Sequence, residues 1–280
     1  MENRFKGYRK LSLRELQLLQ LNAMKHIHQV CLKHNIKYYM IGGTLLGAVR
    51  HKGFIPWDDD IDIAMMREDY ERFKQIFASE FDLSRFFLQH YDSDIDFRPA
   101  MLRVCIKNTI QDYPSEIHHK CCKNTYVDIF PLDNVPDSEL ERDTHIKELL
   151  NIDRLINLKL YHIYEHNSKW YVLFKRIVSK LLFVPLKTLQ KKRIKSMTKY
   201  KSVSTRCVAS TVSKYGYRKQ IMDRNIYGNP ILYDFEDTQL FGVEQVDVYL
   251  TQLFGKKYME IPPENKREVP HDVYIKETTK

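Results

Sequence analysis

Helical and strand patterns alternate through residues 12–136 of this 280-residue chain. Ser12 and Glu15 have the spacing of a capping box, so we expect a helix to begin there and to continue until His34-Asn35. Further along, the patterns predict strands over residues 36–41, 60–65, 101–106 and 126–130, and helices over residues 44–50 and 68–80. Pro131 is expected to end the last of these strands. This order predicts an α+β fold in which helices cover a mixed sheet.

The basic charge of the chain is concentrated in one segment. The chain carries 45 Lys and Arg against 36 Asp and Glu, a formal net charge of +9. Residues 166–222 contain 15 of the basic residues and no acidic one, which leaves 30 basic against 36 acidic residues elsewhere. We therefore expect an α+β core over residues 1–136, followed by a helical, basic region over residues 137–280 that completes the same domain.

The sequence also indicates the cellular compartment in which we expect the protein. Residues 1–10 are charged and polar, and no stretch reaches the roughly 18 apolar residues that a membrane span needs. Five cysteines, an odd number, fit a reducing compartment better than a framework of disulfides. We expect a cytoplasmic protein, either free or peripheral at the inner face of the cell membrane.

Asp60 and Asp62 are the first candidates for chemistry. Residues two apart in a strand share a face, with Cα atoms roughly 6.5 Å apart, so both carboxylates would face one cavity. Ile61 and Ile63 would then point into the core. Carboxylates this close repel one another, and a hard divalent cation such as Mg²⁺ relieves that repulsion. An Asp-x-Asp pattern alone is more often an exposed acidic turn, although turns do not usually alternate with isoleucine.

Gly42, Gly43 and Thr44 lie between a predicted strand and a predicted helix. Glycine allows backbone amides to approach a phosphate closely, and the helix offers its positive end, so these residues form a candidate anion site. The alternative, a tight turn without a ligand, is the more frequent outcome for such a motif by itself. Asp128 lies between Val127 and Ile129 in a predicted strand, where an acid is usually either exposed at an edge or functional.

Together, these residues carry a resemblance to a known family. Two neighbouring motifs are GGTLLGAVRH at residues 42–51 and GFIPWDDDIDI at residues 53–63, and a third is VDIFPLD at residues 127–133. They closely resemble motifs of the LicD family of phosphotransferases, which includes the fukutin-related enzymes. The resemblance is strong over about residues 20–136 and returns weakly at Tyr249-Leu250, Phe254-Gly255, Pro262-Pro263, Arg267 and His271.

The resemblance implies a nucleotidyltransferase-like fold and a transfer reaction. Phosphocholine or a related phospho-substituent would move from a CDP-linked donor such as CDP-choline to a hydroxyl of a cell-surface glycan or lipid-linked glycan precursor (teichoic acid, lipopolysaccharide or capsule). It implies Asp60, Asp62 and Asp128 as catalytic ligands of Mg²⁺ or Mn²⁺, and Gly42, Gly43 and Thr44 as contacts of the donor phosphates. Arg50 and His51, at the end of the short helix, are candidates for a phosphate contact, with a structural salt bridge as the alternative for Arg50.

Two other classes of function stay open. One is a nucleotidyltransferase that moves NMP itself to another acceptor. The other is a non-catalytic module that binds a membrane surface or nucleic acid, against which the clustered Asp60, Asp62 and Asp128 argue. A phosphotransferase of the LicD type would release CMP from its CDP-linked donor, whereas an NMP transferase would release pyrophosphate from CTP.

The acid-free segment begins with an amphipathic pattern. One helical face carries Trp170, Phe174, Ile177, Val178 and Leu181, and the other carries Lys175, Arg176 and Lys180. A core helix with a solvated basic face is the first interpretation. The second is a basic helix on an anionic membrane surface, with Lys191, Lys192, Arg193 and Lys195 adding to the attraction. Nucleic acid is an unlikely partner.

Overall fold

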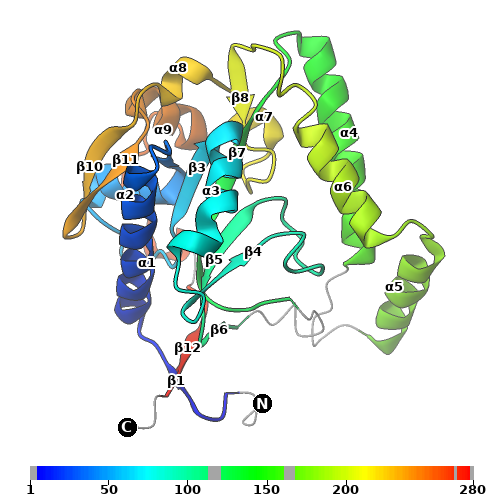
Figure 1. Cartoon of the computed structure of the whole chain (residues 1–280), viewed down its shortest axis with the longest axis horizontal. Helices are drawn as coiled ribbons and strands as arrows, with labels where there is room; N and C mark the ends of the chain where they lie inside the picture. The colour runs from blue at the N-terminus through cyan, green and yellow to red at the C-terminus, as the bar shows by residue number, and fades with distance from the viewer. Residues whose placement is uncertain (1–4, 113–120, 161–167, 268–269, 278–280) are drawn as a thin grey trace.

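A mixed sheet with helices around it forms the centre of the protein, as the computed structural model shows for residues 5–112, 121–160, 168–267 and 270–277 (Figure 1). The strands of its main path follow the order β10 (Ile231–Phe235), β11 (Thr238–Gly242), β2 (Tyr39–Met40), β3 (Asp62–Met66), β7 (Tyr126–Asn134), β5 (Leu102–Ile106) and β4 (Phe86–Gln89). Two short strands, β8 (Cys207–Ala209) and β9 (Met222–Asp223), extend it from the end of β7. The predicted class, a mixed sheet with helices, is confirmed.

The helices occupy distinct places around this sheet. They are α1 (Leu13–Lys33), α2 (Gly42–His51), α3 (Arg67–Glu80), α4 (Glu139–Lys159), α5 (Lys169–Leu181), α6 (Leu186–Met197), α7 (Tyr217–Gln220), α8 (Arg224–Tyr227) and α9 (Val246–Phe254), with a short 3₁₀ turn at Glu264–Lys266. A second, three-stranded sheet joins β1 (Tyr8–Lys10), β12 (Val273–Lys276) and β6 (Thr109–Gln111). Helices α4 and α6 lie side by side, and α5 lies beyond them, far from the main sheet (Figure 1).

The central pair of strands places two acidic residues side by side. Strands β3 and β7 run parallel, and their register sets Asp62 opposite Asp128. Ile63 and Ile129 are fully buried in the same two strands. On the other side of β7, the antiparallel β5 sets Arg103 opposite Asp128. The apolar neighbours therefore pin the register that brings these charged groups together.

Several expected elements are confirmed with nearly the expected bounds. The capping box at the start of α1 is complete, because the Ser12 side chain accepts from the Glu15 N–H and the Glu15 carboxylate accepts from the Ser12 N–H. Helix α3 and strand β5 also match their predicted ranges within one residue. These elements depend on patterns among neighbouring residues alone, so they can be predicted from the sequence.

Other bounds were wrong. Strand β2 keeps only Tyr39 and Met40, because the chain is still closing α1 at Ile36, whose N–H donates to the Cys31 carbonyl. Strand β7 runs through Pro131 to Asn134 instead of ending there. Its partner β5 pairs only as far as Ile129, so the missing N–H of Pro131 falls where β7 has a partner on one side.

The second half of the chain is helical only in its first part. The predicted helical pattern holds over α4, α5 and α6, between residues 139 and 197. Beyond it, β10 and β11 form an antiparallel pair that joins the main sheet through β2. The expectation of a helical second half is corrected, because two of the seven strands on the main sheet's path come from this region.

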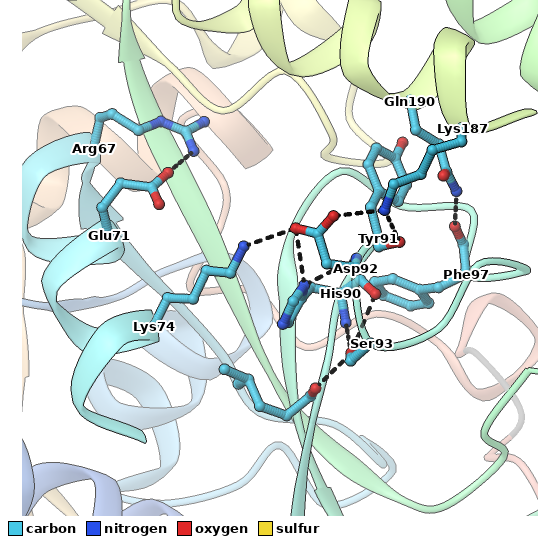
Figure 2. A network of polar contacts seen from close by, with 11 residues as sticks. Arg67, Glu71, Lys74, His90, Tyr91, Asp92, Ser93, Phe97, Lys187 and Gln190 are labelled. Carbon is cyan, nitrogen blue, oxygen red and sulfur yellow. Dashed lines mark hydrogen bonds and ion pairs between the residues drawn. The ribbon is translucent and has the colours of Figure 1, made fainter. Parts of the chain in front are cut away.

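A network of charged and polar contacts fixes α6 to the core. The Asp92 carboxylate accepts from Lys187 of α6 at 2.6 Å and from Lys74 of α3 at 3.3 Å (Figure 2). Gln190 of α6 donates to the carbonyl oxygen of Ile95 at 2.9 Å. Arg193 is 1% exposed and donates to both oxygens of Asp153 on α4. Helix α6 is therefore held by specific polar pairs as well as by packing.

No helix in the part of the chain that the structure describes has both the length and the apolar composition required to cross a bilayer. The five cysteines, all within the described ranges, form no disulfide.

Candidate active site

Asp128 is held by an arginine from the neighbouring strand. Arg103 donates from Nε to Oδ1 at 2.7 Å and from Nη2 to Oδ2 at 3.3 Å. The guanidinium lies 3.7 Å from the centre of the Tyr126 ring and 5.3 Å from that of Phe97, so its plane is fixed by two aromatic rings. Burial raises the pKa of Asp128, and the Arg103 charge and hydrogen bonds oppose that rise without cancelling it. Arg103 thus orients Asp128.

Asp62 faces a different environment. Its backbone N–H donates to the Thr44 hydroxyl at 2.8 Å, which fixes the start of β3 against α2. Burial raises the pKa of the Asp62 carboxyl well above its usual range, and the charges of Asp60, Asp128 and Asp58 raise it further. Lys214 acts in the opposite direction. Asp62 is therefore the centre of a cluster of like charges, with the Lys214 cation nearby.

The prediction that Asp60 lies in the same strand as Asp62 was wrong. Strand β3 begins at Asp62, and Asp60 belongs to the preceding loop. Two side chains of α1 hold this loop, because Gln17 donates to the Asp58 carbonyl at 3.0 Å and Gln20 to the Asp59 carbonyl at 2.8 Å. Tertiary contacts, not strand alternation, therefore hold the loop that carries Asp60.

The loop gathers three carboxylates of its own. Asp58, Asp59 and Asp60 each offer an oxygen within 4.8 Å of the others, close enough to share a metal ion. Burial opposes ionisation of Asp59, but hydrogen bonds from His271 hold its pKa below the usual value. The His271 N–H and ring Nδ1 lie 2.6 and 2.8 Å from Asp59 Oδ2. Asp58 was not among the expected ligands, although it stands in the same motif.

The Gly42-Gly43 step brings the start of α2 against these acids. Gly42 has φ +53°, and the helix begins at this glycine instead of after a turn. A Cβ atom on Gly43 would lie 2.8 Å from the Asp58 carboxylate, so a larger residue would force them apart. The Gly42 N–H donates to the Tyr249 hydroxyl at 3.2 Å, and Thr44 is engaged with Asp62. Gly42, Gly43 and Thr44 were expected to contact the donor phosphates. Of these, Gly43 lines a cleft beside the acidic loop.

Arg50 and His51 lie at the opposite end of α2. The Arg50 guanidinium donates to the backbone carbonyls of Tyr258 and Glu260 at 3.0 and 3.1 Å. His51 approaches Trp57 edge to face, with ring centres 6.2 Å apart. Burial lowers the pKa of His51, and the neighbouring Arg50 charge lowers it further. Arg50 thus joins α2 to the C-terminal segment by hydrogen bonds to backbone carbonyl groups. This structural contact is neither the phosphate contact nor the salt bridge that the sequence left open.

A cleft of about 110 Å³ opens beside the acidic loop. It is lined by Gly43, Leu46, Ile55, Trp57, Asp58, Asp60, Asp62, Lys214, Tyr215 and Phe254. Lys214 and Tyr215 come from the acid-free segment, in the loop between β8 and α7. Sequence reasoning missed both, because nothing in their local pattern separates Lys214 from the other basic residues of that segment.

The weak C-terminal resemblance marks further residues of this site. The Tyr249 hydroxyl accepts from Gly42, Phe254 lines the cleft, and His271 binds Asp59. The Arg267 guanidinium lies 4.3 Å from the centre of the Trp57 ring and so covers one face of the indole. The scattered matches at the end of the sequence are therefore the signal that would have predicted these contacts.

A larger cavity of about 350 Å³ lies on the other side of the same loop. Thr211, Val212, Ser213, Gly216 and Tyr217 line it, whereas Lys214 and Tyr215 line the acidic cleft. Helix α4 provides its apolar wall, and Arg98, Asp153 and Arg193 are among its polar residues. The two cavities are thus separated by a single loop.

The fold and the site define a nucleotidyltransferase-like domain. Asp62 lines the cleft together with Asp58, Asp60 and the N-terminal Gly43 of α2, and Asp128 lies opposite Asp62 in the neighbouring strand. Residues 35–154 match the family described as LicD/FKTN/FKRP, nucleotidyltransferase domain. The chain is also 31% identical over 270 residues to the lipopolysaccharide cholinephosphotransferase LicD of Haemophilus influenzae, covering 95% of this chain and 97% of that protein. The chain belongs to the LicD family.

A second relative matches over a shorter stretch. The ribitol 5-phosphate transferase FKRP of Homo sapiens is 42% identical over 45 residues, which is 16% of this chain and 9% of that protein. The two named activities transfer different phosphate-linked groups. Membership therefore makes this chain a LicD-family transferase, and its donor and acceptor have to be argued separately.

Proposed function

We propose that this protein transfers phosphocholine, or a related phospho-substituent, from a CDP-linked donor to a hydroxyl of a cell-surface glycan, with Mg²⁺ or Mn²⁺ as cofactor. The observation that carries the proposal is the parallel register of β3 and β7, which sets Asp62 beside Asp128 next to the acidic loop. The near full-length similarity to a lipopolysaccharide cholinephosphotransferase supports phosphocholine and lipopolysaccharide as the first donor group and acceptor to test.

The side chains of the cleft suit a divalent cation. Asp62 is surrounded by carboxylates that raise its pKa, and oxygen ligands are those that Mg²⁺ and Mn²⁺ prefer. We assign Asp60, Asp62 and Asp128 as ligands, with Asp58 added because its carboxylate faces the same cleft. When bound, the cation would neutralise the phosphate oxygens and so lower the repulsion between donor and nucleophile.

Individual residues can then be assigned to the steps of the transfer reaction. The acceptor hydroxyl oxygen attacks the phosphorus of the phospho-substituent, the bond from that phosphorus to the bridging oxygen breaks, and CMP leaves with the electron pair. Asp128 takes the hydroxyl proton, since burial raises its pKa and Arg103 holds its orientation. Lys214 stabilises the charge that develops on CMP. A cleft of about 110 Å³ holds the diphosphate, and the neighbouring 350 Å³ cavity provides room for the remainder of a substrate.

The test is to identify the released product. With Mg²⁺, CDP-choline and purified lipopolysaccharide, we expect CMP and phosphocholine-labelled glycan. CDP-ethanolamine, CDP-glycerol and CDP-ribitol serve as competing donors, and the preferred one should also raise the melting temperature most. Release of pyrophosphate from CTP, with no CMP from any CDP-linked donor, would instead establish the NMP-transferring alternative.

The Asp62→Asn variant tests the carboxylate cluster directly. We expect turnover to fall roughly 1000-fold, because a ligand of the phosphate-neutralising cation is lost. The metal-free fold should be equally or more stable, since the substitution removes one charge from a cluster of like charges. Turnover near that of the native protein, with metal supplied in excess, would contradict the assignment of Asp62.

A further inference from the structure

Helix α5 exposes its apolar side chains to solvent. None of its 13 residues is buried, so the interpretation of this segment as a core helix was wrong. Trp170 is 80% exposed, Phe174 60% and Leu181 63%, and Phe183, just beyond the helix, is 90% exposed. Because large apolar side chains gain free energy by leaving water, a contiguous row of them on one helix indicates a binding surface.

The helix is attached to the protein by its polar side. Lys159, in the last turn of α4, donates to the carbonyl oxygens of Ser179 and Leu182 at the end of α5. The Ser179 hydroxyl donates in turn to the Lys159 carbonyl at 3.4 Å. These bonds satisfy carbonyl groups that the end of a helix leaves free. By helical spacing, Ser179 lies on the side of α5 opposite Trp170, Phe174 and Leu181. Helix α5 itself lies at the outer end of the molecule (Figure 1).

The basic residues of α5 flank this row. Lys169, Lys175, Arg176 and Lys180 give the helix four positive charges and no negative one. No ion pair joins any of the four to an acidic residue of the described ranges. Other basic residues of the acid-free segment are engaged: Lys187 binds Asp92, Arg193 binds Asp153 and Arg218 binds Asp143. Four basic residues that have no ion pair within the described ranges therefore flank the apolar row of α5, whereas Lys191, Lys192 and Lys195 of α6 are exposed charges without such a row beside them.

We propose that α5 is an in-plane anchor that seats this protein on an anionic lipid bilayer. The row of Trp170, Phe174, Ile177, Leu181 and Phe183 would enter the boundary between head groups and acyl chains, with Lys175, Arg176 and Lys180 reaching lipid phosphates. This arrangement of aromatic and aliphatic residues between basic ones is typical of helices that lie in the membrane interface. Charge complementarity favours an anionic surface over a neutral one.

A second copy of the chain fits this surface less well. A helix of 13 residues is about 20 Å long, so two such faces would bury roughly 400 Å², below the ~1,200 Å² of stable interfaces. Pairing would also bring the basic residues of both helices together. A bilayer has neither restriction, because it extends beyond the helix and supplies the opposite charge.

The anchor does not depend on the proposed function, but it would assist it. A glycan acceptor carried on a lipid lies at the membrane surface, and a protein held there by α5 searches for it in two dimensions. The network around Asp92 holds α6 to the core (Figure 2). The Arg193–Asp153 pair joins α6 to α4, which carries α5, so the anchor is connected to the catalytic part of the molecule.

The experiment is co-sedimentation of the full chain with vesicles of phosphatidylcholine mixed with phosphatidylglycerol, compared with vesicles of phosphatidylcholine alone. We expect binding to the mixed vesicles and a blue shift of tryptophan fluorescence that the Trp170→Ser variant lacks. The double variant Trp170→Ser with Phe174→Ser keeps the charge and should lower the partition coefficient at least about tenfold. Both side chains are exposed, so the fold should be unaffected.

A matched control separates an anchor from diffuse attraction. The variant Lys191→Gln, Lys192→Gln and Lys195→Gln removes three exposed charges from α6 and leaves α5 intact, so it should retain most of the binding. The proposal is overturned if this variant loses binding while the Trp170 and Phe174 variant keeps it, or if both kinds of vesicle bind equally or not at all. It is likewise overturned if the apolar variant changes only the oligomeric state in gel filtration, since α5 then binds a second copy. Hydrolysis of a soluble CDP-linked donor in the absence of vesicles should be unchanged in the apolar variant, which keeps failure of this proposal distinct from failure of the transfer reaction.

Discussion

The acidic residues of the cleft differ from two acidic residues elsewhere, Asp133 near the far end of β7 and Asp153 on α4. These two are each matched with an arginine: Arg67 donates to both oxygens of Asp133 at 2.7 and 2.6 Å, and Arg193 to those of Asp153 at 2.6 and 3.2 Å. In the cleft, the charges that act most on Asp62 are other carboxylates. Matched pairs hold a fold by themselves, whereas clustered like charges reduce stability unless they bind a cation or a proton. The contrast separates structural acids from chemical ones.

Asp128 tests this contrast most strongly, because it belongs to both classes. We expect Asp128→Asn to lower turnover about 100-fold or more and also to destabilise the protein by about 2 kcal/mol, since the largely buried Arg103 loses its counter-charge. Steady-state kinetics and urea unfolding measure the two effects.

Asp133→Asn is the matched control for Asp128. It lies in the same strand with an equivalent arginine, and should lose similar stability while keeping its turnover. Destabilisation without loss of turnover in Asp128→Asn would place Asp128 with the structural acids and remove it from the mechanism.

We expect the stability of the protein to depend on pH through His90, which lies beside Asp92 in the network that holds α6. Burial lowers the pKa of His90 to about 4, and the Lys74 charge contributes to that shift. Between its unfolded pKa of 6.5 and this folded value, the unfolded chain binds more protons, so the free energy of unfolding falls as the pH falls from 6.5 toward 4. The His90 contribution should be at most about 2 kcal/mol between pH 6.5 and 4.5.

Urea unfolding at several pH values measures this effect against the His90→Asn variant. Asparagine offers an oxygen in place of the ring Nδ1, which accepts from the Asp92 N–H at 3.1 Å, and it does not titrate. The variant should therefore lose less stability on acidification. Parallel curves for the two proteins would show that His90 is not the titrating group.

Lys214 offers the smallest and most specific test of the cleft. Replacing it by Gln should lower turnover of a CDP-linked donor about tenfold, because one positive charge near the departing phosphate is lost. Stability should change by less than about 0.5 kcal/mol, as for other exposed side chains. Lys219→Gln removes the same charge five residues away and outside the cleft lining, so it should have no effect on turnover. Equal losses in both variants would mean that the segment acts through its overall charge.

Much of the site followed from local patterns. The alternation around Asp62 and Asp128 placed both acids at strand positions, and the glycines at 42 and 43 marked the place where a helix begins beside them. Asp60 shows the limit, since it lies in a loop whose backbone carbonyls at Asp58 and Asp59 are bound by Gln17 and Gln20 of α1, about 40 residues away along the chain. Asp58 and Lys214 were missed for the same reason.

The sequence by itself determined the LicD-family motifs, the capped α1 and the apolar residues that set the register of β3 and β7, because capping, alternation and glycine conformation are properties of neighbouring residues. Only the tertiary structure decided that β11 joins β2, that Arg193 is buried against Asp153, that Lys214 enters the cleft and that α5 turns its apolar side to solvent. Each of these depends on contacts between distant parts of the chain. A one-dimensional pattern states which side of a helix is apolar, but the packing of its neighbours determines what that side faces.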